Sequence, residues 1–156
     1  MSNKGFTLLE LMVIVVVIGT LATIAIMSLS GVTAGYRFKG AAREIYSDMQ
    51  VARLGAIKGG TEWALCFSAD GTFSSYSIRN APGADRTLCT ADDPSPYRQV
   101  DCASNYSEIT YVENFPGTKV SFSPRGTSVN GNVTLTSAPR SRQVTVNGMT
   151  GNIRIQ

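Results

Sequence analysis

The sequence predicts an α+β protein in which one long N-terminal helix packs against an antiparallel β-sheet. The first proline is Pro82, so no proline interrupts a helix that runs from Phe6 to about Lys58. The pair Gly59-Gly60 then supplies a helix stop. Beyond this pair, short segments of alternating apolar and polar residues are separated by turn sequences, which is the pattern of antiparallel strands. A single helix laid on such a sheet is an α+β arrangement.

The first part of the predicted helix is apolar enough to lie in a membrane. Residues 11–36 carry no charged side chain. Residues 6–27 form an apolar run of about 22 residues, interrupted only by Glu10, which is long enough to cross a hydrocarbon core of about 30 Å. A cleavable secretory signal with Lys4 as its basic end is the alternative, but the apolar core of such a signal has only about 7 to 15 residues. We therefore expect a permanent membrane segment.

The second part of the helix has the pattern of a helix that packs on a globular domain. Apolar residues recur at spacings of three and four and form one stripe, which consists of Phe38, Ala42, Ile45, Met49, Ala52 and Ala56. Polar and basic residues lie mostly off this stripe. The whole helix would be about 80 Å long, far more than a bilayer needs. The stripe is therefore expected to enter the core of a domain.

Seven segments after the helix are predicted to be β-strands. They are residues 62–68, 72–78, 109–115, 119–123, 132–136, 143–146 and 152–155. Turn sequences separate several of them, namely Asp70-Gly71, Pro116-Gly117, Asn130-Gly131 and Asn147-Gly148. In the last four segments, pairs such as Val133 and Leu135 alternate with polar residues, so one face of the sheet should cover a core.

The composition argues against an enzyme. The chain has 156 residues, no histidine and three cysteines, which removes imidazole acid–base chemistry, Cys/His nucleophile pairs and the usual zinc sites. Serine and threonine are abundant, but no base is available to activate one, and no glycine-rich phosphate loop occurs. Asp85, Asp92, Asp93 and Asp101 could gather around a hard cation such as calcium, but their spacing is not that of an EF-hand loop, and solvated acids in a loop are more common. We predict no catalytic residue, no cofactor and no metal.

The N-terminus carries the motif Lys4-Gly5-Phe6-Thr7-Leu8-Leu9-Glu10-Leu11-Met12-Val13. This motif is similar to the prepilin signal of type IV pilins and type II secretion pseudopilins. The resemblance implies that a prepilin peptidase cuts after Gly5 and N-methylates Phe6, and that the helix stays in the bacterial inner membrane as a single-pass anchor.

Glu10 is the one charged residue of the apolar run. A carboxylate inside an apolar helix costs about 2 to 3 kcal/mol on insertion scales, so a function and a partner are expected for it. The alternative from its position alone is a hydrated carboxylate at the membrane interface. The resemblance implies that Glu10 pairs with the terminal amine of a neighbouring subunit during filament assembly.

Five further segments carry a second resemblance: Ala52-Arg53, Ala56-Ile57-Lys58, and residues 63–71, 122–126 and 151–154. Together they resemble the GspH/FimT branch of minor pilins and pseudopilins. The resemblance implies a type IV pilin-like fold with a leader peptide (residues 1–5), a transmembrane and filament-core helix (6–34) and a periplasmic globular domain (35–156), which is extracellular when the subunit is in a filament.

The function that this branch implies is that of a structural minor pilin. Such a subunit would join other pilin subunits in a type IV filament and serve in assembly, priming or tip display. The alternative is a pseudopilin of the type II protein secretion system. A cysteine in the strand after the helix, here Cys66, resembles the type IV pilus members of the branch more than the secretion members.

The three cysteines allow one disulfide in an oxidising periplasm. Cys89 and Cys102 enclose a loop of about 14 residues, whose closure would stabilise the fold by about 3 kcal/mol. We expect this pair. The alternatives are Cys66 with Cys89 and Cys66 with Cys102.

Charge is distributed unevenly along the chain. Residues 59–113 hold eight acidic and three basic side chains, whereas residues 114–156 hold no acid and five basic side chains: Lys119, Arg125, Arg140, Arg142 and Arg154. Such a region can contact the phosphate backbone of DNA with little sequence preference. DNA receptors of the resembling branch carry a terminal Gly-Arg-x-Arg motif, of which Gly151-Asn152-Ile153-Arg154 keeps only the second arginine. A DNA-binding minor pilin for natural transformation is thus a further alternative, and a solvated basic face is the simpler interpretation.

Overall fold

The computed structural model describes residues 7–68 and 75–156; for residues 25–32 and residue 105 it describes the backbone alone. The chain divides into two units, Met1–Tyr36 (unit 1) and Arg37–Gln156 (unit 2). Helix α1 (Leu8–Gly59) contributes residues to both units. The predicted long helix is therefore confirmed. Its predicted first residue, Phe6, lies outside the described residues.

Unit 2 holds the second part of α1 and all the strands. In chain order these are β1 (Trp63–Phe67), β2 (Ser75–Arg79), β3 (Arg98–Asp101), α2 (Ala103–Tyr106), β4 (Thr110–Glu113), the short 3₁₀ turn η1 (Pro116–Thr118), β5 (Lys119–Phe122), β6 (Gly131–Ser137), β7 (Arg140–Asn147) and β8 (Asn152–Ile155). The seven predicted strands are all present, with ends shifted by up to three residues; part of the second, residues 72–74, lies outside the described residues.

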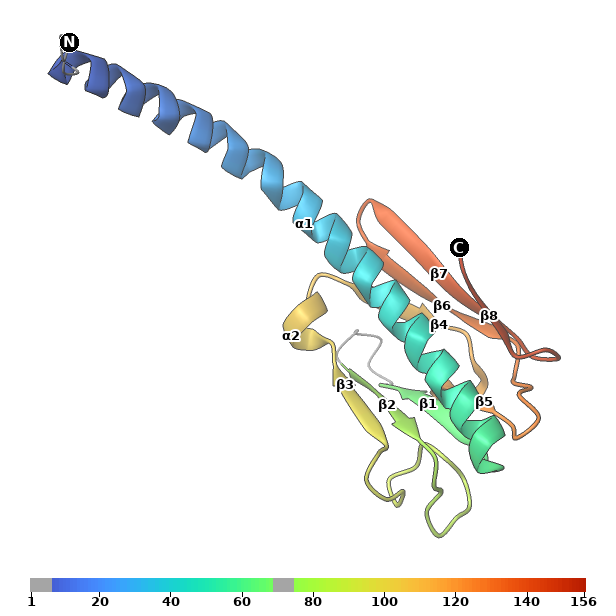
Figure 1. Ribbon diagram of the computed structural model, residues 1–156. Helices are drawn as coiled ribbons and strands as arrows, with labels where there is room; N and C mark the ends of the chain where they lie inside the picture. Colours follow the sequence, from blue (N-terminus) through green and yellow to red (C-terminus); the bar gives the residue numbers. More distant parts are fainter. Residues whose placement is uncertain (1–6, 69–74) are drawn as a thin grey trace, which may run out of the picture. The chain divides into compact units, whose positions relative to one another are not determined.

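Two antiparallel sheets of four strands form unit 2 (Figure 1). Sheet A has the order β3-β2-β1-β5 and sheet B the order β4-β6-β7-β8. The sequence pattern predicted one sheet, and it indicated neither β3 nor α2. Strand β3 reads Arg-Gln-Val-Asp and has one apolar residue, Val100, so it shows no alternating pattern long enough to predict a strand.

One hydrophobic core joins α1 to both sheets. All six residues of the predicted stripe are buried, and Ile45 and Met49 are fully so. They pack in one cluster with the inward side chains of sheet A, such as Leu65 and Phe122, and with those of sheet B, such as Val133. The prediction that the stripe enters the core is confirmed, and the inward faces of the sheets are fixed by the alternation of their residues.

Candidate functional site

Glu10 lies in the first turn of α1 and is exposed. Thr7 begins this turn: its hydroxyl accepts the Glu10 N–H at 3.2 Å, and its carbonyl accepts the Leu11 N–H at 3.2 Å. A negative charge at this end of a helix is favourable because the first N–H groups carry partial positive charge. Gly5 and Phe6, the residues expected to be cut and methylated, lie outside the described residues. Glu10 is thus held on the first turn with its carboxylate exposed.

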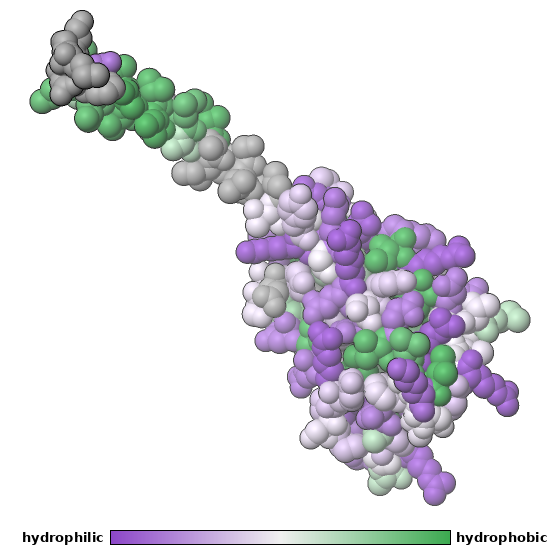
Figure 2. Space-filling view, viewed as in Figure 1, coloured by the Kyte–Doolittle hydropathy of each residue, from purple (hydrophilic) through white to green (hydrophobic). Residues whose placement is uncertain are grey.

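Over residues 8–24, the surface of α1 is apolar apart from Glu10, Thr20 and Thr23. The exposed large apolar side chains are Leu8, Leu9, Leu11, Met12, Val13, Ile14, Val15, Val16, Val17, Ile18, Leu21 and Ile24, and they dominate this part of Figure 2. The hydroxyls of Thr20 and Thr23 donate to helix carbonyls at 2.9 Å, which removes their need for other partners. A helix that is apolar on every side requires an apolar environment.

No helix within the described parts of the chain combines the length and the apolar character that crossing a bilayer requires. The predicted span, residues 6–34, includes residue 6 and the side chains of residues 25–32, which lie outside the described part.

A buried polar network anchors the second part of α1 to sheet A. Asp48 is only 1% exposed, and its carboxylate accepts a hydrogen bond from the Tyr76 hydroxyl at 2.6 Å and one from the Arg98 guanidinium at 2.7 Å. Glu44, one turn earlier, accepts from the Tyr106 hydroxyl at 3.1 Å and pairs with Arg98 at 3.5 Å. Burial and the nearby Asp48 raise the pKa of Tyr76 far above its usual range. These hydroxyls therefore stay protonated as donors.

Three of the family-like segments, residues 52–53, 122–126 and 151–154, meet at Arg53. Its guanidinium donates to the Gly126 carbonyl at 3.2 Å and to the Thr150 carbonyl at 3.0 Å. Gly126 and Gly151 both have positive φ, and a Cβ on Gly151 would lie 1.8 Å from the Gly126 carbonyl oxygen. Only glycine fits this close approach. Segments that are distant in sequence thus form one structural clamp, which we call the Arg53 clamp.

The disulfide joins Cys66 to Cys89, with a Cα–Cα distance of 5.5 Å. This corrects the expected pair, Cys89 with Cys102. Cys66 faces outward from sheet A because its neighbours Leu65 and Phe67 face the core. Cys102 is a free, fully buried thiol in the core and therefore lies on the opposite side of the sheet. Burial raises its pKa to about 12.

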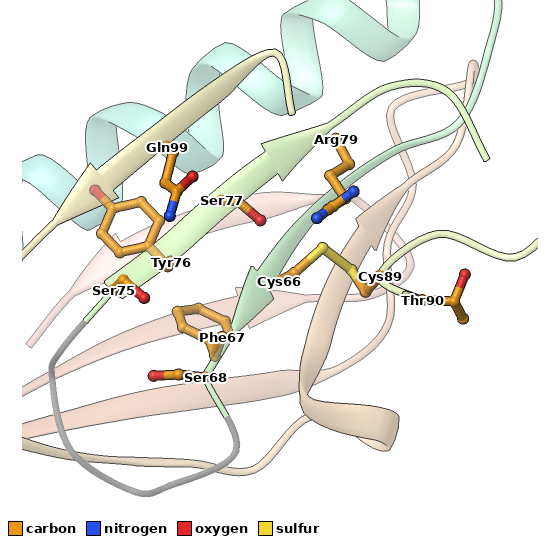
Figure 3. A pocket seen from close by; sticks show the side chains of 10 residues that line it. All are labelled: Cys66, Phe67, Ser68, Ser75, Tyr76, Ser77, Arg79, Cys89, Thr90 and Gln99. Carbon is orange, nitrogen blue, oxygen red and sulfur yellow. A yellow bond between two sulfur atoms is a disulfide. The ribbon is translucent and has the colours of Figure 1, made fainter. Parts of the chain in front are cut away.

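The disulfide fastens residues 80–97 over the outward face of sheet A. The disulfide lines a hollow of about 190 Å³ together with Arg79, Ser77 and Gln99, whose side chains are labelled in Figure 3. The Lys119 ammonium secures the same segment by donating to the Leu88 carbonyl at 2.8 Å. Part of the outward face of sheet A is thereby covered, whereas Gln99 and Asp101 of β3 remain exposed on it.

Three of the four acids considered for calcium do come together. Carboxylate oxygens of Asp85, Asp92 and Asp93 lie within 4.8 Å of one another, without Asp101. Asp93 accepts N–H bonds from Gly83, Cys89 and Thr90 and pairs with Arg79 at 3.5 Å. Although burial opposes its ionisation, these donors hold the pKa of Asp93 below its usual range. The cluster shapes the loop through its own hydrogen bonds.

The five basic residues do not form one face. Arg140 and Arg142 continue the inward row of Val144 and Val146, whereas Arg154 alternates with the inward Ile153 and so faces outward. Lys119 is occupied by the Leu88 carbonyl. Arg125 is exposed in the turn after β5. The assignment of these residues to DNA binding stays a prediction.

Asp48 and Arg98 were missed at the sequence level. Asp48 lies three residues after Ile45 and four before Ala52, so it occupies a position of the apolar stripe. A carboxylate at such a position signals a buried polar contact. Its partner could not be found because β3, which carries Arg98, has no strand pattern.

Comparisons with known proteins support the fold. The family model for type II transport protein GspH matches residues 41–151, and that for the prokaryotic N-terminal methylation motif matches residues 1–26. No curated protein matches the chain.

Solved structures of two kinds share the fold. The type IV minor pilin FimU of Pseudomonas aeruginosa is 17% identical with a TM-score of 0.62, over 80% of this chain and 91% of FimU. The minor pseudopilin EpsH from the Type 2 Secretion System of Vibrio cholerae is 14% identical with a TM-score of 0.58, over 76% of this chain and 94% of EpsH. The predicted pilin-like α+β fold is confirmed.

Proposed function

Because the chain belongs to the GspH family of type II transport proteins, we propose that it is a structural minor pilin of a type IV filament, anchored in the bacterial inner membrane. The observation that carries this proposal is the apolar surface of unit 1, which has Glu10 as its one charged side chain among residues 8–24. Such a surface is satisfied by lipid before assembly and by the helices of neighbouring subunits afterwards.

Maturation of the N-terminus is the first step of this function. A prepilin peptidase removes residues 1–5 and methylates Phe6, which leaves a charged amine near Glu10 in the sequence. The helix over residues 6–34 then remains as the anchor, and the domain over residues 35–156 lies in the periplasm until it enters a filament. Support comes from the match of residues 1–26 to the methylation motif.

Glu10 acts as the selector for correct assembly. Its exposed carboxylate pairs with the terminal amine of a neighbouring subunit, so that two groups that are costly in an apolar environment neutralise each other. Removing one partner would leave the other charge unpaired, which is strongly unfavourable away from water. This makes incorporation sensitive to a single side chain.

A pseudopilin of the type II secretion system is the second candidate. The description of the matching family favours it, because the family is named for type II transport. The disulfide-bonded Cys66 in β1 favours the pilus through its likeness to the type IV pilus members of the branch. Deleting the gene separates the two: loss of surface pili indicates a minor pilin, and retention of secreted proteins in the periplasm indicates a pseudopilin.

The proposal is tested by replacing Glu10→Gln in the native host and measuring the subunit in sheared filaments by immunoblot. We expect normal leader removal and near-complete loss from the filament fraction, because the substitution keeps the shape of the side chain but removes its charge. Glu108→Gln, at an exposed position in unit 2, is the matched control and should enter filaments normally. Wild-type incorporation of the Glu10→Gln subunit would refute the assembly role.

A further inference from the structure

One end of unit 2 carries five basic side chains that come from two elements. Arg37, Lys39 and Arg43 lie on the first turns of the part of α1 that belongs to unit 2, and all three are exposed. Arg140 and Arg142 begin β7, directly after the turn that joins it to β6; the first is exposed and the second is half-buried. We call these five residues the basic end.

Contacts within unit 2 bring the two elements to the same end. The Tyr106 hydroxyl donates to the carboxylate of Glu44, the residue after Arg43. Strand β4 begins shortly afterwards at Thr110, which lies opposite Thr136 in β6, close to the hairpin turn. Figure 1 shows the same arrangement, with the β6–β7 hairpin at the end of unit 2 that holds the first turns of its helix.

Arg140 and Arg142 belong to the face of sheet B that α1 covers. They alternate with Ser141 and Gln143, and they continue the row of Val144, which is fully buried in the core that α1 shares. Alternate residues of a strand share a face. This row therefore changes from apolar to cationic toward the basic end.

The cations of the basic end have no acidic partner within the described part of the chain. Glu44 and Asp48, the acids of this part of α1, both pair with Arg98 instead. Asp101 and Glu108 are exposed acids near α2, and neither forms an ion pair with the basic end. The basic end thus keeps an excess of positive charge, which favours an anionic partner.

The sequence position of the basic end selects the kind of anion. Residues 11–36 are uncharged, and Arg37 is the first charged residue after them. A helix of that length rises about 39 Å, more than a hydrocarbon core of about 30 Å but less than a whole bilayer of about 40 to 45 Å. From Arg37 to Arg43 the helix rises about 9 Å more, close to the depth of one headgroup layer. In a chain anchored by this run, these cations meet lipid phosphates.

We propose that the basic end binds the phosphate groups of anionic phospholipids, with phosphatidylglycerol as the type. Guanidinium groups suit this ligand because they bond to phosphate oxygens in a bidentate manner. Clustered cations next to a membrane helix attract anionic headgroups. The inference rests on the proposed membrane anchor and adds to it, because apolar side chains alone anchor the chain in any lipid, whereas the basic end selects which lipids surround it.

The test counts the lipids that the full chain retains. The chain is reconstituted in nanodiscs with equal amounts of phosphatidylglycerol and phosphatidylcholine, and the lipids that stay bound after release into detergent are identified by native mass spectrometry. We expect phosphatidylglycerol to be preferred by about tenfold, because one cation near an anionic surface contributes about fivefold. Reconstitution in about 0.5 M salt should reduce this preference, since exposed charges are then screened.

Two sets of variants locate the preference. Arg37→Gln, Lys39→Gln and Arg43→Gln together should lower the preference to less than about twofold, because the cations nearest the anchor are lost. Arg140→Gln with Arg142→Gln should lower it by about threefold.

The matched control for the second set is Lys58→Gln with Arg125→Gln. It removes two exposed cations of unit 2 outside the basic end and should leave the preference unchanged. Arg37→Lys with Arg43→Lys keeps the charge and should retain most of the preference. Urea unfolding followed by the fluorescence of Trp63 verifies that each variant is folded.

The possible failures are distinguishable. Equal retention of the two lipids by wild type, or an unchanged preference in the triple variant, would overturn this inference and leave the anchor intact, because co-elution with nanodiscs is scored separately. A chain that does not co-elute with nanodiscs would overturn the anchor and this inference with it. Binding of duplex DNA that depends on Arg140 and Arg142, without a lipid preference, would assign the basic end to a nucleic acid.

Discussion

The apolar side chains of α1 are exposed in one part of the helix and buried in the other. In unit 1, large apolar residues such as Ile14 are exposed around the whole helix, and the exposed fraction of Ile14 is 44%. In unit 2, the stripe that includes Ile45 is buried, and the exposed fraction of Ile45 is zero. One helix thus carries both apolar side chains that are buried in the domain core and apolar side chains that are exposed.

This difference separates folding from assembly. The stripe of unit 2 packs against both sheets, so its contribution is to the stability of the domain. The apolar side chains of residues 8–24 are exposed and lie outside that core, so they are available to lipid or to other helices. Substitutions in the two parts should therefore affect different measurements, even when the residue type is the same.

The largest expected effect comes from the same substitution made in both parts. Ile45→Ala should lower the free energy of unfolding by about 3 kcal/mol, because it opens a cavity in a core that is fully packed. Ile14→Ala should change it by less than about 0.5 kcal/mol, as exposed positions do. Urea unfolding of the full chain in mild detergent, followed by the fluorescence of the single tryptophan, Trp63, measures both.

An equal decrease in the free energy of unfolding for Ile45→Ala and Ile14→Ala would contradict this distinction, because it would mean that unit 1 contributes to the domain core. Ile14→Ala is expected to lower incorporation of the subunit into filaments instead, because it removes apolar surface from the proposed helix contacts.

A smaller effect on the free energy of unfolding is expected from a substitution at Asp48, in the part of α1 that belongs to unit 2. Asp48→Asn keeps the volume of the side chain but replaces charge-assisted hydrogen bonds to Tyr76 and Arg98 with neutral ones. The free energy of unfolding should fall by about 2 kcal/mol in the same urea assay. Glu44→Gln, at a more exposed carboxylate of the same network, should cost less, and the reverse order would contradict the role given to Asp48.

The smallest effect concerns the free thiol of Cys102. Burial raises its pKa from 9.0 to about 12, so its contribution to stability is complete below pH 9 and is lost as the pH rises from 9 toward 12. Tyr76 and Tyr106 also have raised pKa values and act in the same direction. Cys102→Ala should therefore reduce, but not abolish, the loss of stability between pH 9 and pH 10.5.

Thiol labelling checks the same point directly. At pH 8.5 iodoacetamide should modify Cys102 slowly in the native chain and quickly in urea, because the buried thiol stays protonated. Rapid modification of the native chain would show that this part of the core opens readily.

The fold was largely predictable because its elements carry strong local patterns. The apolar spacing of the α1 stripe and the alternation in β5 to β8 are both direct consequences of which side chains face the core. The division into two sheets was not predictable, because register and sheet order depend on contacts between distant residues. Strand β3 was missed since a single apolar residue, Val100, forms its inward contact.

The site residues were predictable to different degrees. Glu10 stands out because a charge in an apolar run is conspicuous in any sequence. The disulfide was predicted incorrectly because loop length favoured Cys89 with Cys102, whereas the sides of sheet A to which Cys66 and Cys102 belong decide the pairing.

The Arg53 clamp has a mechanical consequence. Tension along a helix that ends at Gly59 reaches two turns at once, through the bonds of Arg53 to the Gly126 and Thr150 carbonyls. These two hydrogen bonds lie near the C-terminal end of the helix, so both resist a force that pulls along the helix axis. The buried stripe of α1 packs against both sheets and resists sliding of the helix past them. A subunit built in this way can be pulled by its helix without the force first peeling a single edge strand.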